Sequence, residues 1–257
     1  MNSFEAILIA IVEGLTEYLP ISSTGHMIIT EALLRIPPTA FVKTYTVAIQ
    51  LGAILAVVVL YRKMFLDISR VKFFLKLLVA VCPALVLGAL LGDQIDRFLE
   101  SPLTVAITML TGGIVLLFID HFFRQPVVQE EAAVTPRQAF IVGLWQCIAL
   151  LPGVSRSAAT IIGGLQQRFS RKLAAEFSFY LAVPTMCAAT GYKILKSYHT
   201  FTLDHLYLLV LGNLIAFVVA VVAIRFFLSY LQQKGFRLFG WYRILVGITL
   251  LILIQRG

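Results

Sequence analysis

GLTEYLPISSTGHM, residues 14–27, places a glutamate, three hydroxyl side chains and a histidine within ten residues of an otherwise apolar chain. Charged and imidazole side chains are costly where water is scarce, so this cluster either lies at a wet surface or does chemistry. Pro20 lies inside the cluster and cannot continue the backbone hydrogen bonds of a helix. The stretch therefore predicts a polar break within an apolar segment.

The composition is that of an integral membrane protein. Of the 257 residues, 60% are hydrophobic and only 13% are charged, and the mean hydropathy is +0.92. A span of the hydrocarbon layer takes about 20 apolar residues, so the length allows about eight spans at most. We expect one membrane domain over residues 1–257. The formal charge of +8 comes from short groups of basic residues beside the spans, which argues against nucleic-acid binding.

The start of the chain and the cysteines give two further predictions. The start of the chain, MNSFEAILIA, has no basic region and carries Glu5, so a cleaved signal peptide is not expected. Cys82, Cys147 and Cys187 are odd in number and lie far apart in apolar runs. They are predicted to be small buried hydrophobic residues, not disulfide partners or metal ligands.

Six stretches are long and apolar enough to cross a membrane. They cover about residues 42–61, 74–92, 103–120, 174–194, 206–228 and 238–254. Residues 4–30 and 137–165 instead break at Pro20 or Pro152, pass through small polar residues and become apolar again. Because such breaks leave backbone groups unpaired in lipid, both segments are predicted to be re-entrant hairpins shielded by the other helices. A kinked full span is the alternative.

The basic residues between these segments indicate the orientation. One side has fourteen: Arg62, Lys63, Arg70, Lys72, Lys76, Arg124, Arg137, Arg168, Arg171, Lys172, Arg225, Lys234, Arg237 and Arg243. The other side has six: Arg35, Lys43, Arg97, Lys193, Lys196 and Arg256. The side with fourteen is predicted to be cytoplasmic. The remaining basic residue, Arg156, lies in the second break and belongs to neither side.

With this orientation, one hairpin enters from each side and three spans follow it. Because three is odd, the two halves, about residues 1–125 and 126–257, have opposite topology. GLTEYLPISST and GLWQCIALLPGVSRS support a duplication, since Gly-Leu is followed in both by Glu17 or Gln146, a proline and hydroxyls. We therefore expect an all-α membrane protein of six transmembrane helices and two re-entrant hairpins in an inverted repeat. Broken helices of such repeats meet near the midplane, so both breaks are predicted to share one pocket.

Glu13 and Glu17 are four residues apart, so on a helix they lie on one face. Two carboxylates this close in apolar surroundings repel each other. A shared divalent cation such as Mg²⁺ or Ca²⁺, or a proton kept by one of them, relieves the repulsion. A solvated helix face is the plainer alternative.

The hydroxyls after each proline are candidates for binding phosphate. In the first break they are Ser22, Ser23 and Thr24, followed by His26. One of the serines is expected to cap the restarting helix, and a purely structural histidine is the alternative for His26.

The second break, PGVSRSAAT, surrounds a single arginine with hydroxyls. Ser155 and Ser157 flank Arg156, and the helix continues through Thr160. With the backbone N–H groups of the helix start, these donors form an anion site that suits phosphate. An arginine that extends to the interface is the alternative.

Together these groups indicate phosphoryl transfer within a membrane. The nucleophile is predicted to be Ser23 with His26 as its base, and His26 as the attacking group is the rival assignment. A transporter or flippase of a lipid phosphate is the other functional class, favoured by the inverted repeat. A structural scaffold does not explain why polar residues gather at both breaks.

EGLTEYLPISSTGH, PGVSRSAAT and QLGAILAV (residues 50–57) resemble the undecaprenyl-diphosphate phosphatase family, also called the bacitracin-resistance family, over essentially the whole chain. Ala158 departs from the glycine of many members. The resemblance implies six spans and two re-entrant helix pairs in an inverted repeat. It also implies hydrolysis of undecaprenyl diphosphate to the monophosphate and inorganic phosphate, which recycles the lipid carrier of the cell wall and gives bacitracin resistance.

The resemblance further implies a divalent metal, a bacterial inner-membrane location and a site open to the outer face. The implied site residues are Glu13, Glu17, Ser23, His26, Ser155, Arg156 and Thr160. The expected partners are the polyprenyl diphosphate and membrane lipid. The sequence does not decide whether the chain forms a homodimer.

Overall fold

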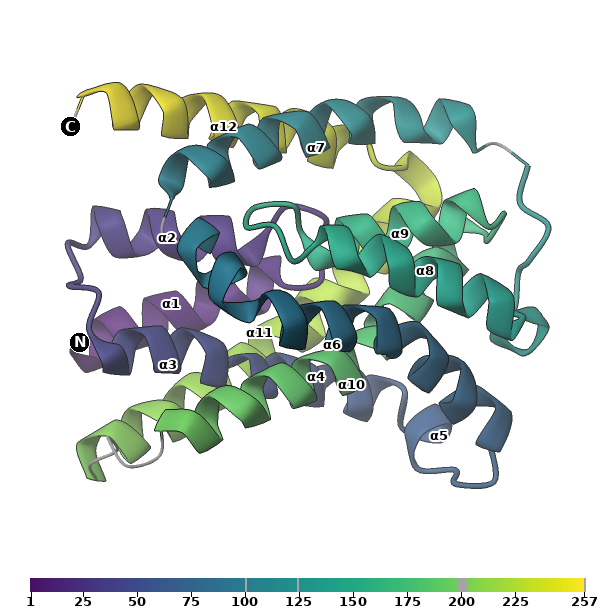
Figure 1. Cartoon of the computed structure of the whole chain (residues 1–257), viewed down its shortest axis with the longest axis horizontal. Coiled ribbons are helices and arrows are strands. Elements are labelled where there is room, and N and C mark those ends of the chain that lie inside the picture. The colour runs from purple at the N-terminus through teal and green to yellow at the C-terminus, as the bar shows by residue number, and fades with distance from the viewer. Residues whose placement is uncertain (100, 124, 198–202, 257) are drawn as a thin grey trace.

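The computed structural model describes residues 1–99, 101–123, 125–197 and 203–256. Within these ranges, every regular element is a helix. The helices lie roughly along one long axis (Figure 1). Both chain termini lie at one end of this axis, which we call the N/C end. The short helix α5 (Arg62–Phe65) lies at the opposite end, which we call the α5 end.

Two helix pairs fold back as hairpins from opposite ends. Helices α1 (Ser3–Thr16) and α2 (Ser23–Leu33) start and finish at the N/C end. Helices α8 (Pro136–Ile148) and α9 (Arg156–Gln166) start and finish at the α5 end. Their turns approach each other in the middle of the molecule (Figure 1). The two predicted breaks are therefore the tips of two hairpins.

The six predicted spans are confirmed as helices long and apolar enough to cross a membrane. They are α3 (Ala40–Ala48) with α4 (Gln50–Leu60), α6 (Val71–Leu99), α7 (Pro102–Phe122), α10 (Arg171–Ser197), α11 (Leu203–Lys234) and α12 (Arg237–Arg256). The first span is two helices because the helix is interrupted at Ile49. Beyond this interruption, the Gly52 N–H donates to the side chain of Asn213 on α11 (2.7 Å).

Both hairpins begin at sequence-encoded caps. Asn2 and Glu5 form a capping box at the start of α1. Thr135 and Gln138 form another at the start of α8, with Pro136 at the first helical position. These residues satisfy N–H groups that a helix start otherwise leaves unpaired.

The backbone repeats itself between the two halves. The residue before each second hairpin helix is a serine with a left-handed backbone: Ser22 has φ 71° and Ser155 has φ 70°. Arg35 (φ 53°) and Arg168 (φ 62°) are again left-handed at matching distances after these serines. Because non-glycine residues rarely adopt this conformation, the matching positions are a strong sign of duplication. Ser23 and Arg156, which follow these two serines, therefore occupy equivalent positions in the two repeats.

Two glycines allow the first helix of each hairpin to lie directly on a spanning helix. A Cβ at Gly14 would meet the carbonyl oxygen of Ala216 on α11. A Cβ at Gly143 would meet the carbonyl oxygen of Ala80 on α6. The duplicated Gly-Leu motif thus encodes the close contact that fixes each hairpin in the bundle.

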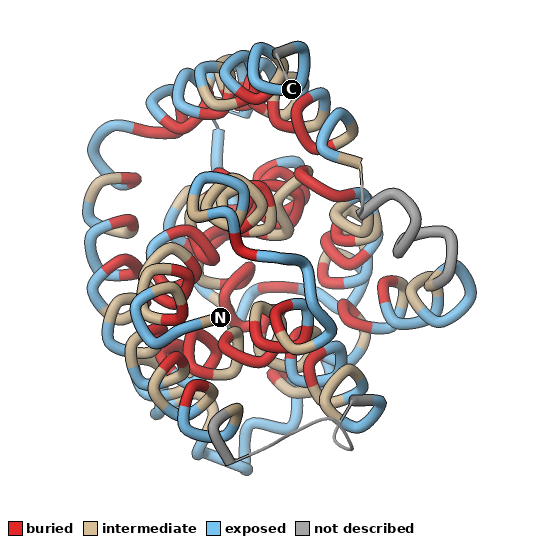
Figure 2. The backbone as a smooth tube through the Cα atoms, turned by 90° about the vertical axis from the view of Figure 1, so that its left-hand side faces the viewer, coloured by how far each residue is buried: buried red, intermediate tan, exposed pale blue. Residues whose placement is uncertain are grey.

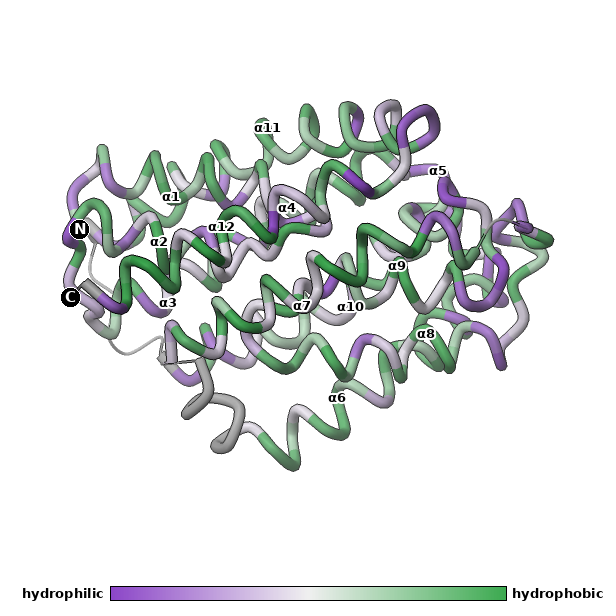
Figure 3. Tube along the Cα trace, turned by 90° about the horizontal axis from the view of Figure 1, so that it is seen from above, coloured by the Kyte–Doolittle hydropathy of each residue, from purple (hydrophilic) through white to green (hydrophobic). Residues whose placement is uncertain are grey.

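Hydrophobic residues prevail along the spans, and hydrophilic residues gather toward the ends of the bundle (Figure 3). Buried residues face the interior of the bundle, as seen from the N/C end in Figure 2. Cys82 and Cys187 lie exposed on α6 and α10, while Cys147 is half-buried. The prediction that the cysteines are buried is therefore wrong for two of them, because an apolar run in a span packs equally well against lipid or protein.

One of the fourteen basic residues counted on the predicted cytoplasmic side does not flank a span. Arg243 is completely buried on α12, so its inclusion in that count is wrong. Lys76 is also buried, but it lies toward the α5 end and pairs there with Glu131 (2.8 Å). Arg124, counted on the same side, lies outside the described residues. The side chains of Arg97 and Arg256, counted on the other side, lie outside those that the structure describes.

Candidate active site

The first break runs from the end of α1 to the start of α2. Glu17 caps the end of α1, and residues 17–21 form turns. Ser22 is the N-cap of α2, and its hydroxyl accepts a hydrogen bond from the Gly25 N–H (3.3 Å). This is the capping role expected for one of the two serines. Ser23, the first residue of α2, does not cap the helix, so its hydroxyl can make other contacts.

The second break has the same construction. Gly153 turns the chain with φ 84°, and Ser155 caps α9 by accepting from the Ala158 N–H (3.2 Å). The Ser155 and Ser157 hydroxyl oxygens are 3.0 Å apart. The N-termini of α2 and α9 therefore both lie near the middle of the molecule (Figure 1). The positive ends of two helix dipoles favour an anion between them.

The two hairpin tips are in contact. The Ser157 hydroxyl donates to the carbonyl oxygen of Leu19 (2.7 Å). The Nη2 atom of Arg156 donates to Oε1 of Glu17 (3.1 Å), and these side chains are only 12% and 7% exposed. The structure thus brings the two breaks into one site, as the inverted repeat predicts.

Glu17 also holds Ser23. The Ser23 hydroxyl donates to Oε2 of Glu17 (2.6 Å), so one carboxylate joins Ser23 of the first hairpin to Arg156 of the second. Ser23 is buried, like Glu17. A short bond to an ionised acceptor is stronger than one between neutral groups.

His26 has other partners. Its Nδ1 lies 2.7 Å from the carbonyl oxygen of Ser22, and its Nε2 lies 2.8 Å from the hydroxyl of Tyr242 on α12. Because a carbonyl oxygen only accepts, Nδ1 carries a proton, and in the neutral imidazole Nε2 accepts from the Tyr242 hydroxyl. Between the described residues Ser23 and His26, no side-chain hydrogen bond is formed. The Ser23 hydroxyl therefore contacts Glu17 and not His26, the base predicted for it.

Glu13 lies beside Glu17 and is completely buried. Within the described residues, no side chain or backbone group donates a hydrogen bond to either of its carboxylate oxygens. An unpaired buried carboxylate is costly, so it requires a cation or a proton. Two carboxylates fit a divalent cation whose remaining ligands come from water or phosphate. The described residues contain no group of three acidic, histidine or cysteine side chains that could complete such a site.

Arg156 is oriented by α10. Its Nη1 atom donates to the carbonyl oxygen of Ser178 (2.9 Å) and lies 3.4 Å from the Ser178 hydroxyl. Thr160 bonds to the Arg156 carbonyl oxygen (2.8 Å) and lies 2.7 Å from the same hydroxyl. The Nε–H group of Arg156 is buried without a partner in the described chain. One donor of the guanidinium therefore stays available for an anion.

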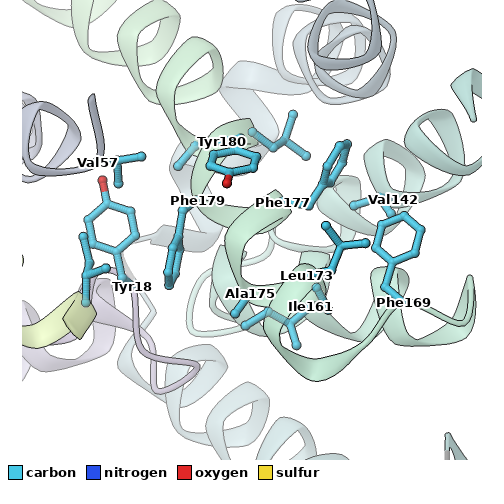
Figure 4. Close-up of a cluster of buried hydrophobic side chains, with 14 of the residues drawn as sticks. Tyr18, Val57, Val142, Ile161, Phe169, Leu173, Ala175, Phe177, Phe179 and Tyr180 are labelled. Carbon is cyan, nitrogen blue, oxygen red and sulfur yellow. The ribbon is translucent and has the colours of Figure 1, made fainter. Parts of the chain in front are cut away.

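Aromatic packing forms one wall of the site. Arg156 lies over the ring of Tyr18, 5.8 Å from its centroid. Tyr18 packs edge-on against Phe179 (5.2 Å), as Figure 4 shows, and its hydroxyl donates to the Ala53 carbonyl oxygen (2.9 Å).

Thr24 is half-buried, and within the described residues its side chain makes no hydrogen bond.

Residues 6–249 match the family described as bacitracin resistance protein BacA. The chain belongs to this family. The undecaprenyl-diphosphatase of Flavobacterium johnsoniae is 51% identical to it, over 98% of this chain and 96% of the relative. The undecaprenyl-diphosphatase of Porphyromonas gingivalis is 48% identical over 100% of this chain and 98% of the relative. That of Fusobacterium nucleatum is 44% identical, over 96% and 99%.

In this BacA family member, three side chains at the site are not found by sequence reasoning: Ser178, Tyr242 and Arg243. Ser178 carried a weak signal, because it is a small polar residue in an apolar span. Tyr242 and Arg243 resemble an ordinary interfacial pair near a helix start. Only the burial of Arg243 and the contacts of both residues with the breaks reveal them.

Proposed function

We propose that this chain hydrolyses undecaprenyl diphosphate to undecaprenyl phosphate and inorganic phosphate at the contact between the two hairpin tips. Family membership and relatives named undecaprenyl-diphosphatase support the reaction. They favour a hydrolase over the transporter alternative. The observation that carries the site is the Arg156–Glu17–Ser23 connection, which joins an anion-binding cation, a base and a hydroxyl across the two halves.

The terminal phosphate of the substrate is bound by the second hairpin. The unpaired Nε–H of Arg156 supplies one donor, and Nη2 becomes a second when phosphate replaces Glu17 as its partner. Two parallel N–H donors match two phosphate oxygens. Arg156 and the start of α9 are held in place by the hydroxyls of Ser155, Ser157 and Thr160. The hydroxyl of Thr24 makes no hydrogen bond within the described residues, so it is available to the phosphate.

Ser23 then attacks. Glu17 receives the Ser23 proton across their 2.6 Å bond, and Oγ forms a bond to the terminal phosphorus. The bond from that phosphorus to the bridging oxygen breaks, and undecaprenyl phosphate leaves with the electron pair. The proton on Glu17 passes to a phosphate oxygen of the departing undecaprenyl phosphate. Water then attacks the phosphorus of the phosphoserine, Glu17 takes a proton from this water and gives it to Oγ as the P–Oγ bond breaks, and inorganic phosphate leaves. This assignment gives the base role to Glu17, because the Ser23 hydroxyl contacts Glu17 and not His26.

His26 remains the rival nucleophile. Its Nε2 lone pair is directed at the Tyr242 hydroxyl, so an attack would require that bond to open. Trapping the phosphoenzyme separates the two assignments. Phosphoserine is stable in acid, and phosphohistidine is labile in acid and stable in base. An acid-labile adduct that persists in Ser23→Ala would overturn the serine assignment.

A divalent cation, Mg²⁺ or Ca²⁺, fits the two carboxylates. Glu13 and Glu17 would hold it, and it would neutralise charge on the phosphate oxygens. The unpaired, buried carboxylate of Glu13 supports this proposal.

The location is proposed from the charge pattern. The basic α5 end is placed on the cytoplasmic side of a bacterial inner membrane, and the N/C end faces outward. The site would then receive its substrate from the outer side.

The central test is phosphate release by the purified protein from undecaprenyl diphosphate in detergent micelles, with Mg²⁺ or Ca²⁺ and with a chelator. Detergent micelles hold no transmembrane gradient that could drive transport, so phosphate release there identifies hydrolysis. Arg156→Ala is the matched inactive control. Binding of lipid without phosphate release by the wild-type chain would support a transporter instead.

A further inference from the structure

Arg243 is a fully buried arginine whose charge no carboxylate neutralises within the described residues. It is the seventh residue of α12, which begins at Arg237. All five of its N–H donors can be accounted for by backbone carbonyl oxygens. These are Met109 (Nε, 3.3 Å), Pro20 and Val154 (Nη1, 3.2 and 3.1 Å), and Thr108 and Gly153 (Nη2, 3.0 and 2.9 Å).

The five acceptors belong to three different parts of the site. Pro20 lies in the first break, and Gly153 and Val154 lie in the second. Thr108 and Met109 lie on α7, which packs along α12 (Figure 1). One guanidinium therefore holds both hairpin tips to the same pair of spanning helices.

The chemistry of these acceptors requires an arginine. Each break interrupts a helix and leaves carbonyl groups without intrahelical partners, which is costly in surroundings that exclude water. A guanidinium presents five donors in a rigid plane, whereas a lysine ammonium has three on a flexible stem. Lysine at position 243 would therefore leave at least two of the five contacts unmade.

The neighbouring helix is shaped for this side chain. A Cβ at Gly112 of α7 would meet the Arg243 guanidinium. The adjacent residue Tyr242 contacts His26 at the start of α2. One turn of α12 thus reaches both breaks and the imidazole of the site.

We propose that Arg243 is a positioning residue that fixes the two hairpin breaks against each other. It sets the spacing between Ser23 and Glu17 on the first hairpin and Arg156 on the second, without touching the substrate. This inference rests on the proposed active site. Displacing reacting groups by about 1 Å can reduce turnover about 100-fold, so loosening this contact should act mainly on kcat.

Three variants test the proposal in detergent micelles. Arg243→Lys keeps the charge and removes donors. Gly112→Ala keeps the arginine but pushes its guanidinium away from the carbonyl groups. Gly247→Ala is the matched control, because its Cβ would meet Leu110 and Ala106 in the same α7–α12 contact, away from the breaks. For each variant, kcat and KM for undecaprenyl diphosphate and the midpoint of thermal unfolding are measured.

We expect Arg243→Lys and Gly112→Ala to lower kcat at least about tenfold with KM changed less than about threefold. Gly247→Ala should lose a comparable amount of thermal stability and keep kcat within about threefold. If Arg243→Lys does not fold, Gly112→Ala carries the comparison alone. Wild-type kcat in Gly112→Ala or a folded Arg243→Lys overturns the proposal, as does an equal loss of kcat in Gly247→Ala.

The Arg156 variants keep this test separate from that of the active site. If Arg156→Ala is inactive while the Arg243→Lys and Gly112→Ala variants turn over normally, the site stands and the positioning role fails. If Arg156→Ala retains full activity, the proposed site itself is wrong.

Discussion

Replacing Arg156 with lysine tests the geometry of the site because it preserves the charge. The guanidinium spans Glu17 (3.1 Å) and the Ser178 carbonyl oxygen (2.9 Å), and its Nε–H stays available for phosphate. A lysine ammonium can replace one of these contacts but not the planar pair that grips two oxygens.

The size of the effect follows from the bonds that are lost. A hydrogen bond to a charged group contributes about 1.5–3 kcal/mol, which corresponds to about 10- to 150-fold in kcat/KM. Arg156→Ala removes both donors of the planar pair, so it loses two such bonds, or about 3–6 kcal/mol. We therefore expect a loss of about 10- to 150-fold for the lysine variant and about 150-fold or more for alanine.

The assay is steady-state phosphate release from undecaprenyl diphosphate, with the unfolding midpoint as a check on folding. Ser178→Ala is the control, because it removes a hydroxyl but keeps the carbonyl group that holds Nη1. It should cost about 0.5–1.5 kcal/mol, or about 2- to 13-fold. Near-normal kcat/KM in Arg156→Lys would refute the bidentate role, and a larger loss in Ser178→Ala would mean that the hydroxyl, not the fork, orients the site.

Three other outcomes follow from the structure. Glu13→Gln should raise the Mg²⁺ or Ca²⁺ concentration for half-maximal activity by about tenfold or more, since an amide is a poor ligand for these ions; an unchanged metal titration would make Glu13 a proton carrier. Tyr242→Phe removes one neutral hydrogen bond to His26, so kcat should change by about 2- to 13-fold, and a loss beyond 100-fold would point to a direct catalytic role for the tyrosine. Gly143→Ala should destabilise the protein by about 1–3 kcal/mol in a thermal melt, because its Cβ meets the backbone of Ala80; an unchanged midpoint would show that α8 and α6 can separate.

The spans and breaks could be predicted from the sequence because a membrane imposes a simple rule. A segment that crosses lipid must satisfy its own backbone hydrogen bonds, so about 20 apolar residues indicate a helix and a central Pro20 or Pro152 indicates a break. The inverted repeat was visible in the shared Gly-Leu and proline pattern. The structure adds the matching left-handed serines, Ser22 and Ser155, at the same position of each hairpin.

The partners of individual side chains could not be predicted in the same way. Ser23 and His26 are three residues apart, which places them near each other on a helix, yet Ser23 bonds to Glu17 across the turn. The direction in which the chain leaves α1 and re-enters α2 decides this choice. Sequence spacing does not contain that direction.

By itself, the sequence determined that this chain is a helical membrane protein with two polar breaks, and its motifs determined the family. These features depend on local composition, which sets the cost of exposing each segment to lipid. Only the tertiary structure decided that Arg243, outwardly one more basic residue near a helix start, is the buried link between both breaks. Its role depends on carbonyl groups from three distant segments, and backbone carbonyls are present in every residue, so no pattern of side chains could reveal which of them converge.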